Sequence, residues 1–149
     1  MRGISISVVI PFYNEASSIK PLFERLIPVL EALNRSWEVM CVDDGSRDDT
    51  LTGLQAVHQR YDAVRTIKFS RNFGKEAALS AGLSRAKGDH VLIMDGDLQH
   101  PPETLTEMVR IQEYGVDMVF GLRRSRDTEG PIRSRFSSIF YRVLSMTSD

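Results

Sequence analysis

The sequence predicts an α/β fold, with a mostly parallel sheet flanked by helices in a single domain. Short runs rich in β-branched residues alternate with amphipathic helical stretches, which is the pattern of βαβ units. The length of 149 residues fits one domain, covering residues 1–149. We expect this domain to be incomplete at its C-terminal end, because the sequence stops at Thr147-Ser148-Asp149 without a capping glycine.

Five short apolar runs are the expected strands. The first is predicted to end at Pro11, and the second is continuously apolar, as a strand buried on both faces should be. The runs are Ile4–Ile10, Glu38–Val42, Val64–Phe69, residues 90–94 and Met118–Gly121.

Amphipathic stretches between these runs predict the helices. The first follows a cap at Ser17 or Ser18, continues to Leu33, and should be kinked at Pro28. The others are expected from a cap at Asp48 or Asp49 to about Arg60, from Lys75 to Ala86 with Gly88 ending the helix, from Pro101 and Pro102 to Gly115, and over the basic stretch Ile132–Met146.

Composition excludes several classes of protein. The 19 basic and 20 acidic residues give a net charge of −1, so no overall field favours nucleic acid as a partner. The single cysteine, Cys41, cannot form an internal disulfide and lies in an apolar run, which fits a reducing compartment. No apolar run approaches the roughly 20 residues that span a bilayer. We therefore expect a soluble, cytoplasmic chain.

The residues with distinctive chemistry gather in segments that follow the predicted strands. In an open α/β sheet, ligands bind at the carboxyl ends of the strands. We therefore expect one ligand site built from four loops, which are Pro11–Glu15, Asp43–Thr50, Ser70–Lys75 and Asp95–Pro102.

The most specific loop begins with Asp95-Gly96-Asp97, a DXD motif. Two carboxylates separated by one small residue can share a hard cation, and Gln99 supplies a neutral oxygen nearby. Mg²⁺ or Mn²⁺ suits such all-oxygen ligation. Gly96 is expected to let the backbone bend and to leave room for a ligand. The alternative is a solvated turn, in which Asp and Gly are common.

Two other loops suit a nucleoside. Asp43 and Asp44 follow the second strand, where a carboxylate commonly accepts hydrogen bonds from a base or ribose. Helix capping alone does not explain this pair of like charges. In Pro11–Glu15, an aromatic ring suits stacking on a nucleobase and a carboxylate suits hydrogen bonding to it, and a plain surface turn is the alternative.

Basic residues suit phosphate. Arg71 and Lys75 stand where a loop enters a helix, and the helix N-terminus and Lys75 both favour a phosphate or sugar hydroxyl nearby. The alternative is a solvated basic turn without a ligand. A second basic group is either a solvated face or a site for an anionic acceptor, since arginine forks suit phosphate oxygens. Its members are Arg123, Arg124, Arg126, Arg133 and Arg135.

Motif placement excludes other enzymes. No Gly-x-Gly-x-x-Gly follows the first strand, so an NAD or FAD site is excluded, and the Walker spacing is absent. A phosphatase would carry its Asp-x-Asp after the first strand rather than the fourth, and a nucleotidyltransferase needs a glycine-rich first loop. A glycosidase needs carboxyl groups about 5–10 Å apart across its substrate, which neighbours on one turn do not provide.

Four motifs together resemble family 2 glycosyltransferases with the GT-A fold. Within that family the chain is similar to the polyprenyl-phosphate branch, such as dolichol-phosphate mannosyltransferases and bactoprenol glucosyltransferases. The resemblance covers essentially the whole chain and rests on Ser7 to Glu15, Val42-Asp43-Asp44-Gly45-Ser46, Asn72-Phe73-Gly74-Lys75 and Asp95-Gly96-Asp97-Leu98-Gln99.

The resemblance implies a role for each motif. The first two motifs would line the base and ribose pocket, the third would lie near the sugar diphosphate, and the fourth would bind metal and act in catalysis. The residues concerned are Pro11, Tyr13, Glu15, Asp43 and Asp44 for the nucleoside, Lys75 for the diphosphate, Asp95, Asp97 and Gln99 for the metal, and Arg123, Arg133 and Arg135 for a lipid phosphate.

The resemblance also implies the reaction, which is a metal-dependent, inverting transfer from a UDP-sugar or GDP-sugar to a polyprenyl phosphate. Members of the family are usually about twice this length, and their later part often carries membrane helices. The full-length protein is therefore expected at the cytoplasmic face of the membrane, in cell-envelope synthesis. The alternatives are a truncated domain that binds nucleotide-sugar without turnover, and a family 2 transferase acting on a saccharide hydroxyl.

Overall fold

The computed structural model describes residues 6–119 and 121. The chain divides into two compact units, Met1–Met118 and Val119–Asp149, and every helix and strand described below belongs to the first. The domain boundaries that we expect, residues 1–149, stay a prediction. The elements alternate in the order β1 (Ile6–Phe12), α1 (Ala16–Ala32), β2 (Trp37–Asp43), α2 (Thr50–Arg60), β3 (Val64–Lys68), α3 (Lys75–Leu83), β4 (His90–Ile93) and α4 (Thr104–Gln112).

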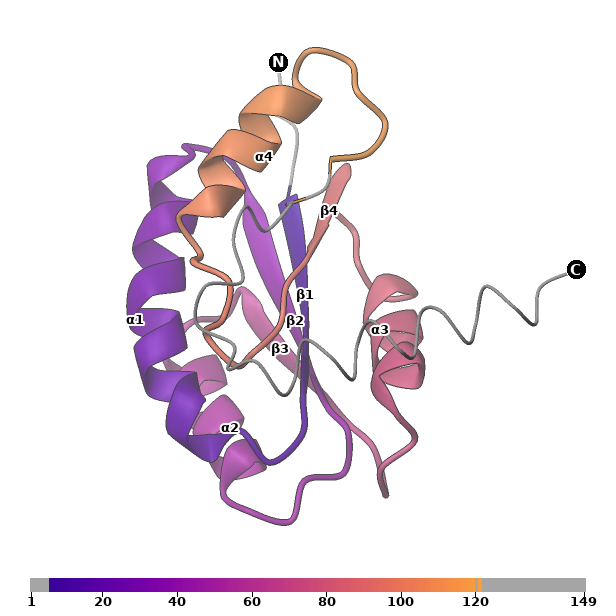
Figure 1. The fold of residues 1–149 in the computed structure, drawn as a ribbon. Helices are drawn as coiled ribbons and strands as arrows, with labels where there is room; N and C mark the ends of the chain where they lie inside the picture. The colour runs from indigo at the N-terminus through magenta and orange to yellow at the C-terminus, as the bar shows by residue number, and fades with distance from the viewer. Residues whose placement is uncertain (1–5, 120, 122–149) are drawn as a thin grey trace, which may run out of the picture. The chain divides into compact units, whose positions relative to one another are not determined.

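The described strands form one parallel sheet in the order β3-β2-β1-β4. Helices α1, α2 and α4 cover one face of this sheet, and α3 covers the other (Figure 1). The predicted fold class, a parallel sheet flanked by helices, is confirmed. Because all the strands run the same way, their carboxyl ends, and the loops that follow them, lie at the same edge of the sheet.

The main core lies between the sheet and α1, α2 and α4. Leu22, Leu26 and Leu30 recur every four residues on one side of α1 and are fully buried, as is Val8 of β1. Burying each such side chain stabilises the fold by about 1.5–3 kcal/mol. Cys41 is a free, buried thiol whose pKa is raised by that burial, so it packs as a small apolar side chain, as predicted.

β1 continues through Pro11, where we expected it to end. The Phe12 carbonyl accepts a hydrogen bond from the Asp44 N–H at 2.9 Å, so Phe12 faces β2 and its neighbour Pro11 faces the β4 side. β4 pairs only with residues 6–9 of β1, and the last bond on that side runs from the Met94 N–H to the Val9 carbonyl at 3.2 Å. Within the described part of the chain, no strand pairs with Pro11 on its β4 side, so its missing N–H costs no ladder bond.

Helix α1 begins at Ala16, before the predicted caps at Ser17 and Ser18. Its first N–H groups are satisfied from the start of α2: the Glu15 N–H donates to Thr50 Oγ1 at 2.8 Å, and the Ala16 N–H donates to Asp48 Oδ2 at 3.2 Å. A tertiary contact therefore replaces a local cap, which sequence patterns do not reveal.

Helix α1 continues through Pro28 without a break, and the kink expected there stays a prediction. Pro28 lies on the exposed side of α1, and so does Glu24, whose carbonyl loses its helical donor. Water can satisfy a carbonyl on that side.

The start of α2 depends on a carboxylate at one of the predicted caps. Asp48 Oδ1 accepts the Thr50 N–H at 3.0 Å and the Thr50 hydroxyl at 2.5 Å. The hydroxyl bond is the main cause that lowers the pKa of Asp48 below its usual value. This carboxylate therefore stabilises the fold at neutral pH, and that contribution is lost as the pH falls through the lowered pKa.

Other predicted elements also differ from the structure. α3 ends at Leu83, before Gly88, whose N–H instead donates to Ser7 Oγ of β1 at 2.8 Å. The expected strand Met118–Gly121 is not formed: residues 118, 119 and 121 are outside any strand, and residue 120 is not described. Met118 is 65% exposed, so it lacks the burial that would favour a strand.

The basic stretch Ile132–Met146 lies outside the described residues. Across residues 6–119, no helix combines the length and the apolar character needed to cross a membrane.

We predict that Thr50→Val lowers the free energy of unfolding by about 1–3 kcal/mol. The change keeps the size of a fully buried side chain but leaves the Glu15 N–H without its acceptor. Urea unfolding measures the loss. The control is Thr52→Val on the exposed side of α2, which should change stability by less than about 0.5 kcal/mol. Equal losses for the two variants would contradict this account of the α1 start.

Candidate functional site

The loop after β1 is bonded to the loop after β2 through Asn14. The Asn14 N–H donates to Ser46 Oγ at 3.0 Å, and Asn14 Oδ1 accepts the Arg47 N–H at 2.9 Å. Asn14 has a φ of +55°, a left-handed conformation that asparagine tolerates better than most residues. The first two of the four predicted loops therefore form one hydrogen-bonded unit.

The loop after β2 is bonded in turn to the loop before α3. The carboxylate of Asp44 accepts the Phe73 N–H at 2.7 Å through Oδ1 and the Gly74 N–H at 2.9 Å through Oδ2. Gly45 has a φ of +68°, and a Cβ on it would stand 2.3 Å from the carbonyl carbon of Arg71. Only glycine allows this backbone conformation and this close approach together.

An ion pair joins the third loop to the fourth. The Lys75 Nζ, at the first residue of α3, lies 2.5 Å from Asp95 Oδ1. Asp95 follows β4, so this pair joins the start of a helix to the end of a strand.

The four loops surround one cavity of about 300 Å³ at the carboxyl edge of the sheet. In Figure 1, the loops after β1, β2 and β3 lie together at the lower end of the sheet. Of the residues that we predicted for the site, Pro11, Tyr13, Glu15, Asp44, Lys75, Asp95 and Asp97 line this cavity.

The other predicted residues are either absent from the lining of this cavity or not described by the structure. Asp43 and Gln99 are not among the lining residues. Asp43 is fully buried, with Oδ1 accepting the Ser46 N–H at 3.1 Å, whereas Oδ2 has no hydrogen-bond partner within the described part of the chain. Arg123, Arg133 and Arg135 lie outside the described residues.

The loop after β4 is shaped by tight packing. A Cβ on Gly96 would stand 2.5 Å from Cε1 of Phe12, so glycine is required there for close packing rather than for the backbone bend that we expected. Leu98 has a φ of +61°, which is strained for a non-glycine residue and is typical of functional loops. The Gln99 N–H donates to Asp97 Oδ1 at 3.0 Å and orients that carboxylate.

The acidic residues of the cavity fit a divalent cation that is coordinated partly by the protein and partly by a bound nucleotide and water. In residues 6–119 and 121, no group of three or more His, Cys, Asp or Glu side chains is placed to hold a metal. Asp95 and Asp97 nevertheless line the same cavity. Mg²⁺ in nucleotide sites is usually held by one or two carboxylates, with phosphate oxygens and water completing the shell. The two carboxylates fit that pattern.

Sequence reasoning missed several lining residues. Phe12, Asn72, Gly74 and Ala78 also border the cavity. Ala78 could have been found, since it stands three residues after Lys75 and hence on the same side of the helix. The other three lie in segments that we had recognised, but their residue types alone do not indicate which backbone faces a ligand.

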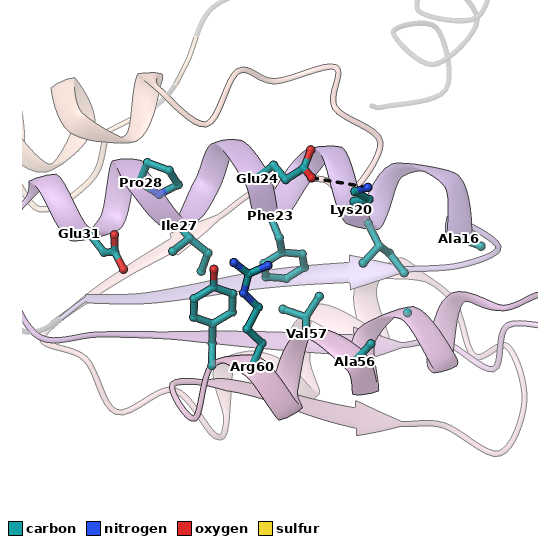
Figure 2. A pocket seen from close by; sticks show the side chains of 13 residues that line it. Ala16, Lys20, Phe23, Glu24, Ile27, Pro28, Glu31, Ala56, Val57 and Arg60 are labelled. Carbon is teal, nitrogen blue, oxygen red and sulfur yellow. Dashed lines mark ion pairs between the residues drawn. The ribbon is translucent and has the colours of Figure 1, made fainter.

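A larger hollow, of about 610 Å³, lies between α1 and α2 (Figure 2). Phe23, Ile27 and Val57 provide apolar surface there, and the exposed Lys20 and Glu24 form an ion pair at 3.9 Å. None of the predicted site residues that the structure describes lines this hollow. The candidate site is therefore identified by the residues that line it and not by the size of the cavity.

Comparison with known proteins places the chain among glycosyltransferases. The sequence profile described as Glycosyl transferase family 2 matches residues 7–147. An uncharacterized glycosyltransferase of Synechocystis sp. is 43% identical over 141 residues, which are 95% of this chain and 44% of that protein. The undecaprenyl-phosphate 4-deoxy-4-formamido-L-arabinose transferase of Pseudomonas syringae pv. syringae is 40% identical over 122 residues, covering 81% of this chain and 36% of that protein. The chain thus spans less than half the length of these relatives.

A solved structure supports the same grouping. The mannosyltransferase PcManGT from Pyrobaculum calidifontis, in complex with GDP-Man and Mn²⁺, matches with a TM-score of 0.62 and 29% sequence identity. The match covers 70% of this chain and 31% of that one. The GT-A fold that the resemblance implied is confirmed.

We predict that Gly45→Ala destabilises the chain more than Gly115→Ala, as measured by urea unfolding. Both glycines have positive φ, +68° and +82°, so both variants carry the backbone strain of about 1–2 kcal/mol. A Cβ at Gly115 meets nothing within 4 Å, whereas at Gly45 it meets the backbone of Arg71, which adds about 1–3 kcal/mol. Equal losses would mean that the two loops are not packed as described.

Proposed function

Because the chain belongs to glycosyl transferase family 2, we propose that it is the donor-binding part of a metal-dependent, inverting glycosyltransferase. The donor is a UDP-sugar or GDP-sugar, and the acceptor is a polyprenyl phosphate. The observation that carries this proposal is the cavity at the carboxyl edge of the sheet, which four carboxylates, a lysine and two aromatic rings line together.

The nucleoside end of the donor is assigned to the loops after β1 and β2. Tyr13 is 42% exposed and lines the cavity together with Pro11 and Glu15, so its ring is free to stack on a base. The buried Asp43 Oδ2 lacks a donor among the described residues, and a base N–H or a ribose hydroxyl would supply one.

The diphosphate end is assigned to Lys75, Asp95 and Asp97. Their positions in one cavity, and the Mn²⁺ in the complex of PcManGT, support Mg²⁺ or Mn²⁺ as the cofactor. A bound cation would offset the charge that develops on the departing nucleoside diphosphate. Gln99 remains our third candidate ligand, and its N–H already orients Asp97.

Lys75 has a second role in this proposal. Its ammonium lies against Asp95 and supplies positive charge beside Asp95 and Asp97, in a cavity that is otherwise lined by carboxylates. The side chain is 55% exposed, so it is free to turn from Asp95 to a donor phosphate. The chain thus carries its own counter-charge before a donor binds.

The acceptor proposal is supported by the relatives. One of them is named as an undecaprenyl-phosphate transferase. A phosphate monoester has a second pKa of about 6, so it carries a nucleophilic oxygen at neutral pH and needs no dedicated general base. We propose that Arg123, Arg133 and Arg135 meet this phosphate at the cytoplasmic face of the membrane.

We predict metal-dependent binding of UDP or GDP by the 149-residue chain in calorimetry. Asp97→Asn should weaken that binding by about tenfold or more, since it removes a charged ligand oxygen. The matched control is Asp62→Asn, which neutralises an exposed carboxylate between α2 and β3 and should bind like the unchanged chain. Binding of neither nucleotide with Mn²⁺ would refute the proposed function.

Product analysis with a polyprenyl phosphate follows that binding test. Formation of a glycosyl polyprenyl phosphate identifies a transferase that acts without further residues. Donor binding without product indicates instead a donor-binding domain, a role that fits a chain spanning less than half of its relatives.

We predict that Lys75→Met acts in opposite directions on two affinities. Binding of Mn²⁺ alone should strengthen several-fold, because the ammonium no longer competes for Asp95. Binding of UDP or GDP with Mn²⁺ should weaken by about tenfold, because a phosphate partner is lost. Electron paramagnetic resonance measures the first affinity and calorimetry the second, with Lys87→Met, an exposed lysine outside the cavity, as the control. Weakening of both affinities would show that Lys75 does not compete with the metal.

A further inference from the structure

Asp44 makes an unusual set of contacts for a carboxylate beside a ligand cavity. It is only 3% exposed, although it lines the cavity. Each of its two oxygens accepts one backbone N–H, from Phe73 at 2.7 Å and from Gly74 at 2.9 Å. Hydrogen bonds to an ionised carboxylate are about twice as strong as neutral ones. The charge of Asp44 is therefore directed at the backbone of another loop.

The two N–H groups lie directly before the first residue of α3. Phe73 and Gly74 are the last residues before α3, and Gly74 is its N-cap position. Lys75 is the first residue of α3, and its ammonium lies 2.5 Å from Asp95. A shift of the backbone at Gly74 would move Lys75 with it.

We propose that Asp44 is a positioning residue, which fixes the entry of α3 so that Lys75 faces Asp95 and the donor diphosphate. This inference rests on the proposed function and changes one expectation within it, because the resemblance implied that Asp44 contacts the base or ribose. The packing of Gly45 against Arg71 supports it independently, since it holds the same two loops together.

The two roles differ in which part of the donor they affect. A direct contact with the nucleoside would serve a nucleoside and a nucleoside diphosphate equally. A role through Lys75 would serve only ligands that carry the diphosphate. The negative charge also matters, because an asparagine offers one acceptor oxygen and would turn an amide NH₂ toward the second backbone N–H.

The first test compares UDP and GDP with uridine and guanosine, in the presence of Mn²⁺. Asp44→Asn should weaken binding of the preferred diphosphate by about tenfold or more. Binding of the matching nucleoside, followed by NMR titration, should change by less than about twofold. Equal losses for nucleoside and diphosphate would overturn the inference in favour of direct contact.

The control is Asp48→Asn. Asp48 also accepts two backbone N–H groups, those of Thr50 and Ala16, but these belong to the starts of α2 and α1. Like Asp44→Asn, this variant removes a carboxylate that holds segments together. It leaves Phe73, Gly74 and Lys75 undisturbed. It should leave diphosphate binding nearly unchanged, and a loss equal to that of Asp44→Asn would show that general loosening is responsible.

A double-mutant cycle tests whether Asp44 acts through Lys75. In the Lys75→Met background, Asp44→Asn should weaken diphosphate binding by less than about twofold. Additive losses would overturn the inference, since they would show that Asp44 acts independently of Lys75.

The hydrogen bonds themselves are tested without a nucleotide. Amide exchange of Phe73 and Gly74, followed by NMR, should accelerate in Asp44→Asn and not in Asp48→Asn. Unchanged exchange would overturn the inference even if the chain binds nucleotide. If the unchanged chain binds neither UDP nor GDP, the proposed function fails, and the exchange data still decide whether Asp44 holds the entry of α3. Asp44→Ser, which keeps one acceptor in a smaller side chain, replaces Asp44→Asn if that variant does not fold.

Discussion

The parallel pairing of β1 with β2 is the constraint on which the rest of the site depends. Phe12 stands opposite Asp43, and the Phe12 carbonyl accepts the Asp44 N–H at 2.9 Å. Both strands therefore end at the same level, and the loops that follow them start side by side. The bonds of Asn14 to Ser46 and Arg47 are possible only because of this register. A shift by one residue would reverse the side chains of a strand that is buried on both faces.

Polar side chains in these loops fall into two groups with different tasks. Asp44, Asp48 and Asn14 each accept a backbone N–H of a neighbouring loop or helix start and hold these segments together. Asp95 and Asp97 face the cavity, each with one oxygen already oriented by Lys75 Nζ or the Gln99 N–H. A site whose loops are bonded to one another needs little rearrangement when a charged ligand arrives, and such preorganisation favours electrostatic stabilisation of the diphosphate.

The fold class, the order of elements and the four loops could be predicted from local patterns. β-branched runs, helical periodicity and the Asp95-Gly96-Asp97 motif depend on neighbouring residues, so they can be read without a structure. Element ends were less predictable. α1 starts at Ala16 because Thr50 and Asp48 accept its first N–H groups, and Pro11 stays in β1 because β4 has already ended. Both reasons involve residues far away in the sequence.

The sequence by itself determined which chemical groups reach the carboxyl edge of the sheet, because strand order and the residues after each strand decide that. Only the tertiary structure decided how each group is used. Asp43 and Asp44 are adjacent and chemically identical, yet Asp43 is fully buried with one oxygen unpaired among the described residues, and Asp44 bonds to Phe73 and Gly74. Successive residues at a strand end point in different directions, so their partners come from different loops. Those partners exist only after the chain has folded.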